Sequence, residues 1–455
     1  MRILLVRPRS SPNTIGLQHL MRVEPLELEA IAATIPEEDK ILIVDMILED
    51  KPIEYFIREF DPHIFCTTGY ITHVQVMKDY CRIAKSIKPS IKTIVGGVHV
   101  EKFPEDLNDE SVDYRVVRNA IIVFPELIEH IKKNVLIPPG VLAIKERLNG
   151  QLLPDYNFKF PFPRRDLTKK YRNKYFYVFH DKVALIKTSF GCPYKCNFCF
   201  CRKITNDNYF IRPLENVIKE LKSISEEEIY VVDDNFLYDK DKVREFINAL
   251  KANNIRKKYL VYGRADFIIS NVGLLEEFYR WGLRTVIVGL ESFNNSELNA
   301  YNKRTDLDTN KECMHILNKL GIDCYAAIIV PPEWDTSDFH EAQKYINELK
   351  IKFLNLQPLC PLPGIDMRFS EKDLIINRKD FAKWDLAHVY IRPKRLTTKE
   401  FYDHILRLYI RSIYRPGNVI SLMKYPLNMQ WRIHIGLFKI LNQYKKEIMI
   451  HKQYA

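Results

Sequence analysis

Residues 189–203 read SFGCPYKCNFCFCRK and contain four of the nine cysteines of this 455-residue chain. Three of them, Cys192, Cys196 and Cys199, have the spacing C-x3-C-x2-C directly after a β-rich run at residues 183–189. An odd number of unevenly spaced cysteines is not the framework of a disulfide-stabilised secreted domain. The stretch therefore indicates a metal-binding or reactive loop at the end of a strand, in a chain kept in a reducing compartment.

Three thiolates so close in sequence can bind one face of an iron–sulfur cluster and leave one iron open. A zinc site would normally need a fourth Cys or His nearby. Cys201 is available, but it lies two residues after Cys199 and is expected to point away from it. Zinc and a purely structural role stay open as alternatives. Four other cysteines lie in apolar patterns and are predicted to be buried free thiols: Cys66, Cys81, Cys313 and Cys324.

The cysteine loop opens a series in which β-rich runs alternate with helical patterns. The β-rich runs occupy residues 183–189, 228–234, 259–264, 285–292, 324–330 and 353–359. Six consecutive strand–helix units predict a parallel barrel, complete or partial, with its site at the carboxyl ends of the strands. The cysteines follow the first of these strands, where a barrel carries its chemistry.

The first third of the chain alternates in the same way, with β-rich runs at residues 2–6, 41–45, 63–68, 91–97 and 112–117. This pattern predicts a doubly wound parallel sheet that binds ligands at its carboxyl edge. We predict an α/β chain in four parts: a Rossmann-like domain (1–140), a linker (141–180), a partial (β/α)6 barrel (181–370) and a mostly helical region (371–455). The linker is rich in proline, aromatic and basic residues, and we expect it to help close the barrel mouth.

Composition excludes several classes of protein. The 46% hydrophobic content rules out general disorder, and no apolar run approaches the ~18 residues of a membrane span. The net charge of +11 is spread along the chain and no nucleic-acid-binding module is visible, so we expect no nucleic acid partner. Without a signal peptide, a cytoplasmic location is the expectation.

The cysteine loop resembles the signature of the radical S-adenosylmethionine (SAM) superfamily, C-x3-C-x-aromatic-C, with Phe198 in the aromatic position. The resemblance implies a [4Fe–4S] cluster on Cys192, Cys196 and Cys199. It also implies that SAM binds the open iron and yields a 5′-deoxyadenosyl radical, with electrons from an external donor of the flavodoxin or ferredoxin type. The protein's own task is then to hold the cofactor and exclude competing reactions.

The ends of the later barrel strands carry the residues that the resemblance assigns to SAM. Carboxylates suit its ammonium group, an arginine suits its carboxylate, and polar side chains suit its ribose. These residues are Asp233, Asp234, Arg264, Glu291, Ser292 and Gln357. The alternative for the two aspartates is that they cap the next helix. The fifth strand, AAIIVPPEWD, departs from the family's glycine-containing run, which leaves the adenine contacts open.

The N-terminal domain resembles the cobalamin-binding class of this superfamily through PLELEAIAATI, GYITHVQVMKDYCRIAK and IVGGVHVEKFPE. The residues that the resemblance places against cobalamin are Thr68, Gly69, Gly96, Gly97 and His99. Two departures matter. The motif that supplies an axial histidine is missing, and His63 in DPHIFC is not expected to replace it. The family's Gly-Glu-x-Glu loop is replaced by residues 119–122, NAII.

The resemblance as a whole predicts a cobalamin-dependent radical SAM enzyme, with methyl transfer to an unactivated carbon of a small or lipid-like molecule as its reaction. Non-methylating radical chemistry, such as a cyclisation, is an alternative within the same architecture. A corrinoid-binding sensor is the alternative from another class, although a sensor has no need of an open iron. Basic and apolar residues near the C-terminus, in QWRIHIGLFKIL, are compatible with a peripheral membrane contact, and ordinary helix packing is the alternative.

Overall fold

The computed structural model describes residues 1–148 and 159–452, and part of the predicted linker, residues 149–158, lies outside this range. The chain forms two units. One contains Met1–Thr14, Glu24–Lys174 and Arg378–Asp385, and the other contains Ile15–Val23, Tyr175–Asn377 and the residues from Leu386 onward. Each unit therefore takes in a short segment that is distant in sequence from the rest of it.

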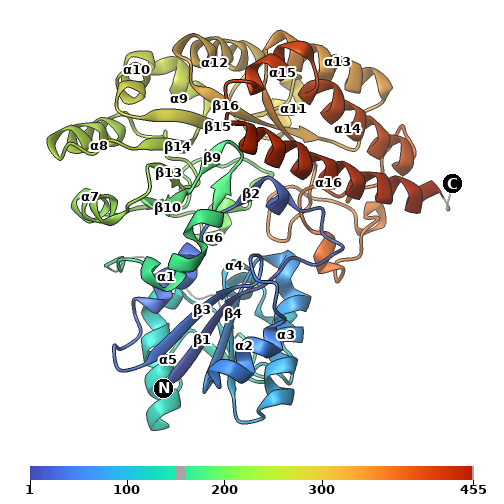
Figure 1. Ribbon diagram of the computed structural model, residues 1–455. Coiled ribbons are helices and arrows are strands. Elements are labelled where there is room, and N and C mark those ends of the chain that lie inside the picture. Colours follow the sequence, from blue (N-terminus) through green and yellow to red (C-terminus); the bar gives the residue numbers. More distant parts are fainter. Residues whose placement is uncertain (149–158, 453–455) are drawn as a thin grey trace. The chain divides into compact units, whose positions relative to one another are not determined.

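The first unit is built on a six-stranded sheet with the order β3-β1-β4-β5-β6-β7 (Figure 1). Its strands are β1 (Arg2–Arg7), β3 (Lys40–Asp45), β4 (Ile64–Thr68), β5 (Lys92–Gly96), β6 (Tyr114–Val116) and β7 (Val141–Ala143). All neighbours are parallel except β6 and β7, which are antiparallel. This order reverses between β1 and β4, and ligands of doubly wound sheets bind at such a switch point.

Helices cover both faces of this sheet. They are α1 (Leu26–Ala32), α2 (Ile53–Phe60), α3 (Val74–Ile87), α4 (Val98–Lys102) and α5 (Ala120–Lys133), with 3-10 turns at Ile71–His73, Pro104–Leu107, Arg165–Lys174 and Phe381–Lys383. The apolar sides of α2 and α3 pack on one face, and those of α1 and α5 pack on the other. Burial on both faces explains why the strands read as continuous apolar runs.

The second unit is built on six parallel strands in sequential order, β10-β13-β14-β15-β16-β17 (Figure 1). They are β10 (Ala184–Ile186), β13 (Glu228–Val231), β14 (Lys258–Gly263), β15 (Leu283–Glu291), β16 (Asp323–Val330) and β17 (Phe353–Pro358). Because crossovers between parallel strands are right-handed, sequential order places all their helices on one face. The other face becomes the inside of a partial barrel, and the predicted fold class is confirmed.

The outer helices of the barrel are α7 (Leu214–Ser223), α8 (Lys240–Ala252), α9 (Ala265–Ser270), α10 (Val272–Arg280), α11 (Asn295–Ala300), α12 (Leu307–Leu320) and α13 (Thr336–Glu348). Aspartates begin several of them. The side chains of Asp239, Asp306 and Asp335 accept hydrogen bonds from backbone N–H groups in the first turns of α8, α12 and α13. These caps satisfy donors that have no partner within the helix.

Three helices complete this unit: α14 (Thr398–Ile413), α15 (Pro416–Leu422) and α16 (Leu427–Lys452). Two small antiparallel sheets add to it. One joins β2 (Met21–Arg22), β8 (Phe176–Tyr177) and β9 (His180–Asp181), and the other joins β11 (Ser189–Phe190) and β12 (Phe210–Ile211). A short helix, α6 (Cys201–Ile204), and 3-10 turns at Leu17–His19 and Glu371–Asp373 complete the second unit.

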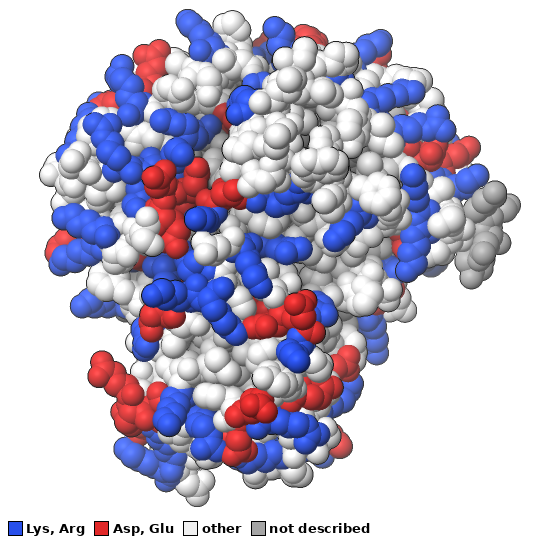
Figure 2. Space-filling view, viewed as in Figure 1, with Lys and Arg blue, Asp and Glu red and all other residues white. Residues whose placement is uncertain are grey.

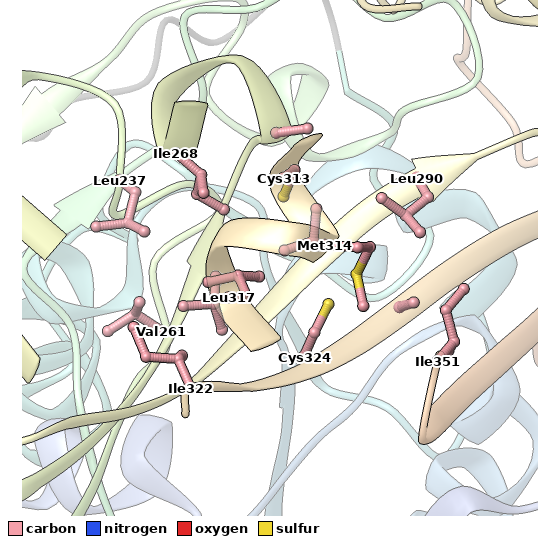
Figure 3. Close-up of a cluster of buried hydrophobic side chains, with 14 of the residues drawn as sticks. Leu237, Val261, Ile268, Leu290, Cys313, Met314, Leu317, Ile322, Cys324 and Ile351 are labelled. Atoms are coloured by element: carbon pink, nitrogen blue, oxygen red, sulfur yellow. The ribbon is translucent and has the colours of Figure 1, made fainter. Parts of the chain in front are cut away.

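The core of the second unit lies between the barrel strands and the outer helices. Figure 3 shows Leu317 of α12 among side chains of neighbouring strands and helices, together with Cys313 and Cys324. Both cysteines are buried free thiols, as the sequence predicts. Burial raises the pKa of each, so they behave as small apolar side chains.

We expect Leu317→Ala to lower the free energy of unfolding by about 2 to 5 kcal/mol, because the fully buried side chain would leave a cavity. Ile211→Ala removes a comparable apolar side chain that is 47% exposed, and it should cost less than about 1 kcal/mol. Denaturant unfolding followed by circular dichroism measures both changes. Equal effects of the two variants would contradict this account of the core.

Candidate radical SAM and cobalamin sites

A buried carboxylate at the end of β13 fixes the start of the cysteine loop. Asp233 Oδ1 accepts hydrogen bonds from the backbone N–H groups of Thr188 (2.7 Å) and Ser189 (3.0 Å). Its Oδ2 accepts from both hydroxyls, Ser189 Oγ at 2.8 Å and Thr188 Oγ1. Burial raises the pKa of Asp233, and the nearby Lys187 and these donors oppose that effect. A carboxylate has about four acceptor positions, so Asp233 has none left for a ligand ammonium.

The carboxylate of the next residue, Asp234, has fewer of its hydrogen-bond acceptor positions filled. It accepts a hydrogen bond from the Gly191 N–H at 3.1 Å, and the Lys187 ammonium lies 3.9 Å away. Gly191 has φ +82°, and a Cβ there would lie 2.2 Å from the carbonyl oxygen of Asn208. Glycine is therefore required at the turn that leads into Cys192. Of the two aspartates, Asp234 keeps more capacity for SAM, and Asp233 positions the loop.

The three cysteines of the motif lie in this one loop, between β11 and α6. Burial raises the pKa of Cys196, and it raises that of Cys192 to about 11; the proximity of the other thiols adds to both shifts. Lys303 and Arg264 oppose this for Cys196, because their positive charges favour its thiolate. In the described residues, no group of three or more His, Cys, Asp or Glu is arranged to hold a single metal ion.

The donor set nevertheless fits an iron–sulfur cluster, because three soft sulfur ligands come from one short loop. Iron binding displaces the thiol protons, so it relieves the cost that burial places on the thiolates. The structure thus supplies the ligands and also the positive charges that favour their ionised forms.

The expectation for Cys201 was wrong. The Cys201 thiol hydrogen-bonds Cys199 and thereby lowers the pKa of Cys199, and it also contacts Asp234. The chain is coiled here, since Cys199 N–H donates to the Cys196 carbonyl at 3.2 Å and Phe200 has φ −85° and ψ −23°. In this turn the side chain of the fourth cysteine lies beside that of the third.

Arg264, which follows β14, lies beside the cysteine loop. Its guanidinium is 3.8 Å from the ring centre of Tyr194 and donates to Cys196 Sγ at 3.9 Å. It also pairs with Asp266 at 2.9 Å and donates to the Lys303 carbonyl at 2.7 Å. Arg264 therefore holds positive charge next to the predicted cluster, with part of its donor capacity already used.

Glu291 and Ser292, at the end of β15, are buried and each has a side-chain hydrogen-bond partner. Glu291 pairs with Lys303 at 2.8 Å, and its φ of +63° is unusual for a residue other than glycine. Ser292 Oγ donates to Glu297, which also accepts from Trp334 Nε1 at 3.0 Å. Strained backbone of this kind is often found at functional sites. Lys303 was missed by sequence reasoning, because nothing in a loop lysine 12 residues after Glu291 indicates burial.

Phe198 and Gln357 also lie within this unit. The Phe198 ring packs edge-on against Tyr301, with centroids 5.5 Å apart. Gln357 pairs in register with Ile329, and Phe353, four pairs earlier and so on the same face, is opposite Tyr325. Because paired residues of parallel strands share a face, Gln357 lies on the inner face of the barrel, near the carboxyl end of β17.

The part of the aromatic linker in this unit does not close the barrel mouth, in contrast to the expectation. Instead, the β8–β9 hairpin packs on the inner face at the amino ends of the strands. Tyr177 stacks on Tyr325 at 5.9 Å, and His180 contacts Glu228 and Thr285 at 2.8 Å each. Glu228 begins β13, so the hairpin lies at the end opposite the cysteine loop. The hairpin buries its aromatic rings there against Tyr230 and Tyr325, which sequence reasoning also missed.

Four of the residues predicted to contact cobalamin meet at the carboxyl edge of the first sheet. Thr68 and Gly96 are register partners at the ends of β4 and β5. Gly97 has φ +102°, and a Cβ there would lie 2.6 Å from Thr68 Oγ1 and 3.0 Å from the Gly69 carbonyl. The Oγ1 of the neighbouring Thr67 is buried without a hydrogen-bond partner. This close-packed glycine turn with a free polar atom beside it fits a ligand that approaches the backbone closely.

Two histidines of this unit have defined places. His99 Nε2 is 2.9 Å from Asp106 Oδ2, and its ring packs against Phe103. His63 precedes β4, and its Nδ1 accepts a hydrogen bond from the Arg2 N–H at 2.9 Å. His63 thus lies at the amino end of the strand, and the Gly97 turn lies at the carboxyl edge of the sheet.

Residues 186–346 match the family model "Radical SAM superfamily", and residues 14–128 match "B12 binding domain". The chain is a radical SAM protein with a B12-binding domain. Membership implies a [4Fe–4S] cluster and SAM as cofactors, and the second domain implies cobalamin. The residues described above fit these groups by the chemistry of their donors, by the Gly97 turn and by the unpartnered Thr67 Oγ1.

Two curated proteins and one solved structure are similar to this chain. Hopanoid C-3 methylase of Methylococcus capsulatus is 28% identical over 85% of this chain and 76% of its own length. An anaerobic magnesium-protoporphyrin IX monomethyl ester cyclase of Rubrivivax gelatinosus is 24% identical over 82% of this chain and 70% of its own. The solved structure of the radical SAM methyltransferase TsrM from Kitasatospora setae contains cobalamin and a [4Fe–4S] cluster. It aligns with 98% of this chain and 99% of its own, with a TM-score of 0.68 and 15% identity. This likeness shows a shared fold.

We expect anaerobically reconstituted protein to contain about four irons per chain. Alanine at Cys192, Cys196 or Cys199 should reduce this to less than about one, because each removes a corner ligand. Cys201→Ala is the matched control in the same loop and should keep about four, since it removes contacts to Cys199 and Asp234 but no predicted iron ligand. Iron and sulfide analysis measures these contents, and loss of iron from Cys201→Ala would contradict the ligand assignment.

Asp233→Asn should lower the iron content by at least about half and the free energy of unfolding by about 1 to 3 kcal/mol. The amide would point donor hydrogens at Thr188 and Ser189, so buried polar groups would lose their partners. Asp234→Asn, with the same chemical change one residue later, should keep its iron and instead weaken SAM binding in equilibrium dialysis. A full iron complement in Asp233→Asn would show that this carboxylate does not position the loop.

Proposed function

We propose that this protein is a cobalamin-dependent methyltransferase that acts on an unactivated carbon of a small or lipid-like molecule. The observation that carries the proposal is the combination, in one chain, of a three-cysteine loop after β10 and a close-packed glycine turn in a B12-binding domain. The similarity to a hopanoid methylase supports both the reaction and a lipid-like substrate.

When bound, the cluster and SAM supply hydrogen-atom abstraction, and cobalamin supplies methyl carriage. The residues of the chain have supporting tasks. Asp233 holds the cysteine loop against β13, and Asp234 and Gln357 present polar groups at the carboxyl ends of their strands. Arg264 and Lys303 place positive charge beside Cys196, where the thiolate ligand carries negative charge. Burial of these groups limits the access of water to reactive species.

The electron donor and the location are further parts of the proposal. We propose an external reductant of the flavodoxin or ferredoxin type. All nine cysteines are free thiols, which supports a reducing cytoplasm as the place of action. Among the described residues, the longest apolar stretches of helix fall short of what is needed to cross a bilayer.

A non-methylating radical reaction is the second candidate, because the Rubrivivax gelatinosus cyclase is similar over most of the chain. It uses the same cluster and differs only in the fate of the substrate. A corrinoid sensor is disfavoured, since sensing does not require the three clustered thiols of the cysteine loop or the charges placed beside Cys196.

The three functions give different results in one assay with reconstituted protein, hydroxocobalamin, a low-potential reductant and SAM labelled in its methyl group. A methyltransferase should bind about one corrinoid per chain, transfer the label to it and form 5′-deoxyadenosine. A non-methylating enzyme should form 5′-deoxyadenosine and transfer no label, and a sensor should do neither. Mass spectrometry and the visible spectrum measure all three quantities.

Gly97→Val separates the two sites in this assay. The new side chain would meet Thr68 Oγ1 and strain the backbone, so bound corrinoid should fall below about a tenth of an equivalent. Iron content and 5′-deoxyadenosine formation should stay near those of the unaltered protein, because the thiols belong to the other unit. Gly273→Ala, where nothing lies within 4 Å of the new Cβ, is the control. Full corrinoid binding by Gly97→Val would overturn the placement of cobalamin.

A further inference from the structure

The long helix α16 is apolar on two faces, and only one of them is buried. Ile433, Leu437, Ile440 and Tyr444 are each less than 9% exposed and pack within the second unit. A surface helix of a globular protein normally has charged or polar residues on its other side, and a helix that is apolar all round is normally enclosed. The outer face of α16 therefore requires an explanation.

The outer face carries a continuous apolar stripe. Leu427, Trp431, Ile435 and Phe438 are 74%, 68%, 51% and 63% exposed, and their spacing of four, four and three residues places them in one line along the helix. Met449, 61% exposed, continues the line. Ile420 and Met423, 68% and 72% exposed, precede it in and just after α15. We call these seven residues the apolar stripe.

The charges around the stripe have one sign. Residues 405–450 contain eight Lys or Arg and a single acidic residue, Glu447, which is buried. Arg411, Lys439, Lys445 and Lys446 are exposed and have no ion-pair partner in the described part of the chain. At 100° per residue, Lys445 falls on the line of the stripe, and Lys439 and Lys446 lie along one side of it. In Figure 2 the surface where α16 runs in Figure 1 is largely white, with Lys and Arg atoms beside it.

We propose that the apolar stripe and its basic residues bind the surface of an anionic lipid bilayer. An interfacial helix has Trp, Phe and Leu on one side for the acyl boundary and Lys or Arg beside them for lipid phosphates, which is the arrangement here. Lysine stems can lie along the apolar surface while their ammonium groups reach the headgroups. The helix lies on the bilayer and does not cross it, in keeping with the polar and charged residues along its length.

Charge argues against a second copy of this chain as the occupant. A two-fold symmetric contact places the same surface on both partners. Lys439, Lys445 and Lys446 would then face one another across an apolar contact, with Glu447 already buried in its own unit. Like charges in such a position oppose association, whereas lipid phosphates neutralise them.

Membrane binding does not depend on the reaction proposed above, and it would bring the enzyme to lipid-like substrates. The test measures vesicle binding alone. Vesicle binding can therefore be absent while the proposed methyl transfer stands, and methyl transfer can be absent while vesicle binding stands.

Sedimentation of the full-length protein with vesicles tests the proposal. Vesicles of equal parts phosphatidylglycerol and phosphatidylcholine should bind it, and vesicles of phosphatidylcholine alone should bind it at least about tenfold more weakly. The double variant Trp431→Ser, Phe438→Ser should lose at least about tenfold in affinity for the anionic vesicles. The triple variant Lys439→Gln, Lys445→Gln, Lys446→Gln should bind the two vesicle types with similar affinity. Phe162→Ser, at an exposed Phe outside the stripe, should bind like the unaltered protein.

Folding and oligomeric state are measured on the same samples. Each variant should keep its iron content and circular dichroism spectrum, because the altered side chains are exposed. The proposal is overturned if unaltered protein does not bind anionic vesicles, or if the stripe variants bind as well as it does. It is also overturned if light scattering finds a dimer that the stripe variants convert to a monomer, because the stripe would then be a contact between copies.

Discussion

The Asp233 carboxylate, buried at the end of β13, determines where the cysteine loop begins. It accepts hydrogen bonds from the backbone and hydroxyl groups of Thr188 and Ser189, so the chain leaving β10 is fastened to the adjacent strand. The three thiols follow within ten residues, and their positions depend on that attachment and on the Gly191 turn. A buried carboxylate with all its acceptor positions filled is costly to disturb, which makes the loop a rigid platform for a cluster.

Both units place most of their predicted site residues at the carboxyl ends of parallel strands. In the second unit these ends carry the cysteine loop, Arg264, Glu291 and Gln357, and in the first they carry Thr68 and the Gly96–Gly97 turn. Parallel strands end at a common edge, so residues far apart in sequence come together without any local signal. The amino ends of the strands have a structural role, because His63 and the β8–β9 hairpin make hydrogen bonds there.

Sequence patterns predicted the fold well, because the strands of both sheets are parallel apart from β7 and are buried on both faces, and such strands appear as distinct apolar runs. They also located the cysteine loop and most strand-end residues. They failed where side-chain direction depends on local coiling, as for Cys201, and where a partner arrives from an unmarked loop, as for Lys303. The linker hairpin was misplaced because aromatic composition predicts burial and says nothing about which end of a barrel it covers. Asp233 and Asp234 could not be told apart, since their difference lies in the donors that surround each carboxylate.

Electron paramagnetic resonance of the anaerobically reconstituted and reduced protein, recorded without and with SAM, tests the central claim most directly. Three thiolate ligands leave one iron free to bind the added cofactor. The account predicts the signal of a reduced [4Fe–4S] cluster whose g-values shift when SAM is added. A cluster signal that SAM leaves unchanged, or a loop that holds zinc and gives no iron–sulfur signal, would contradict it.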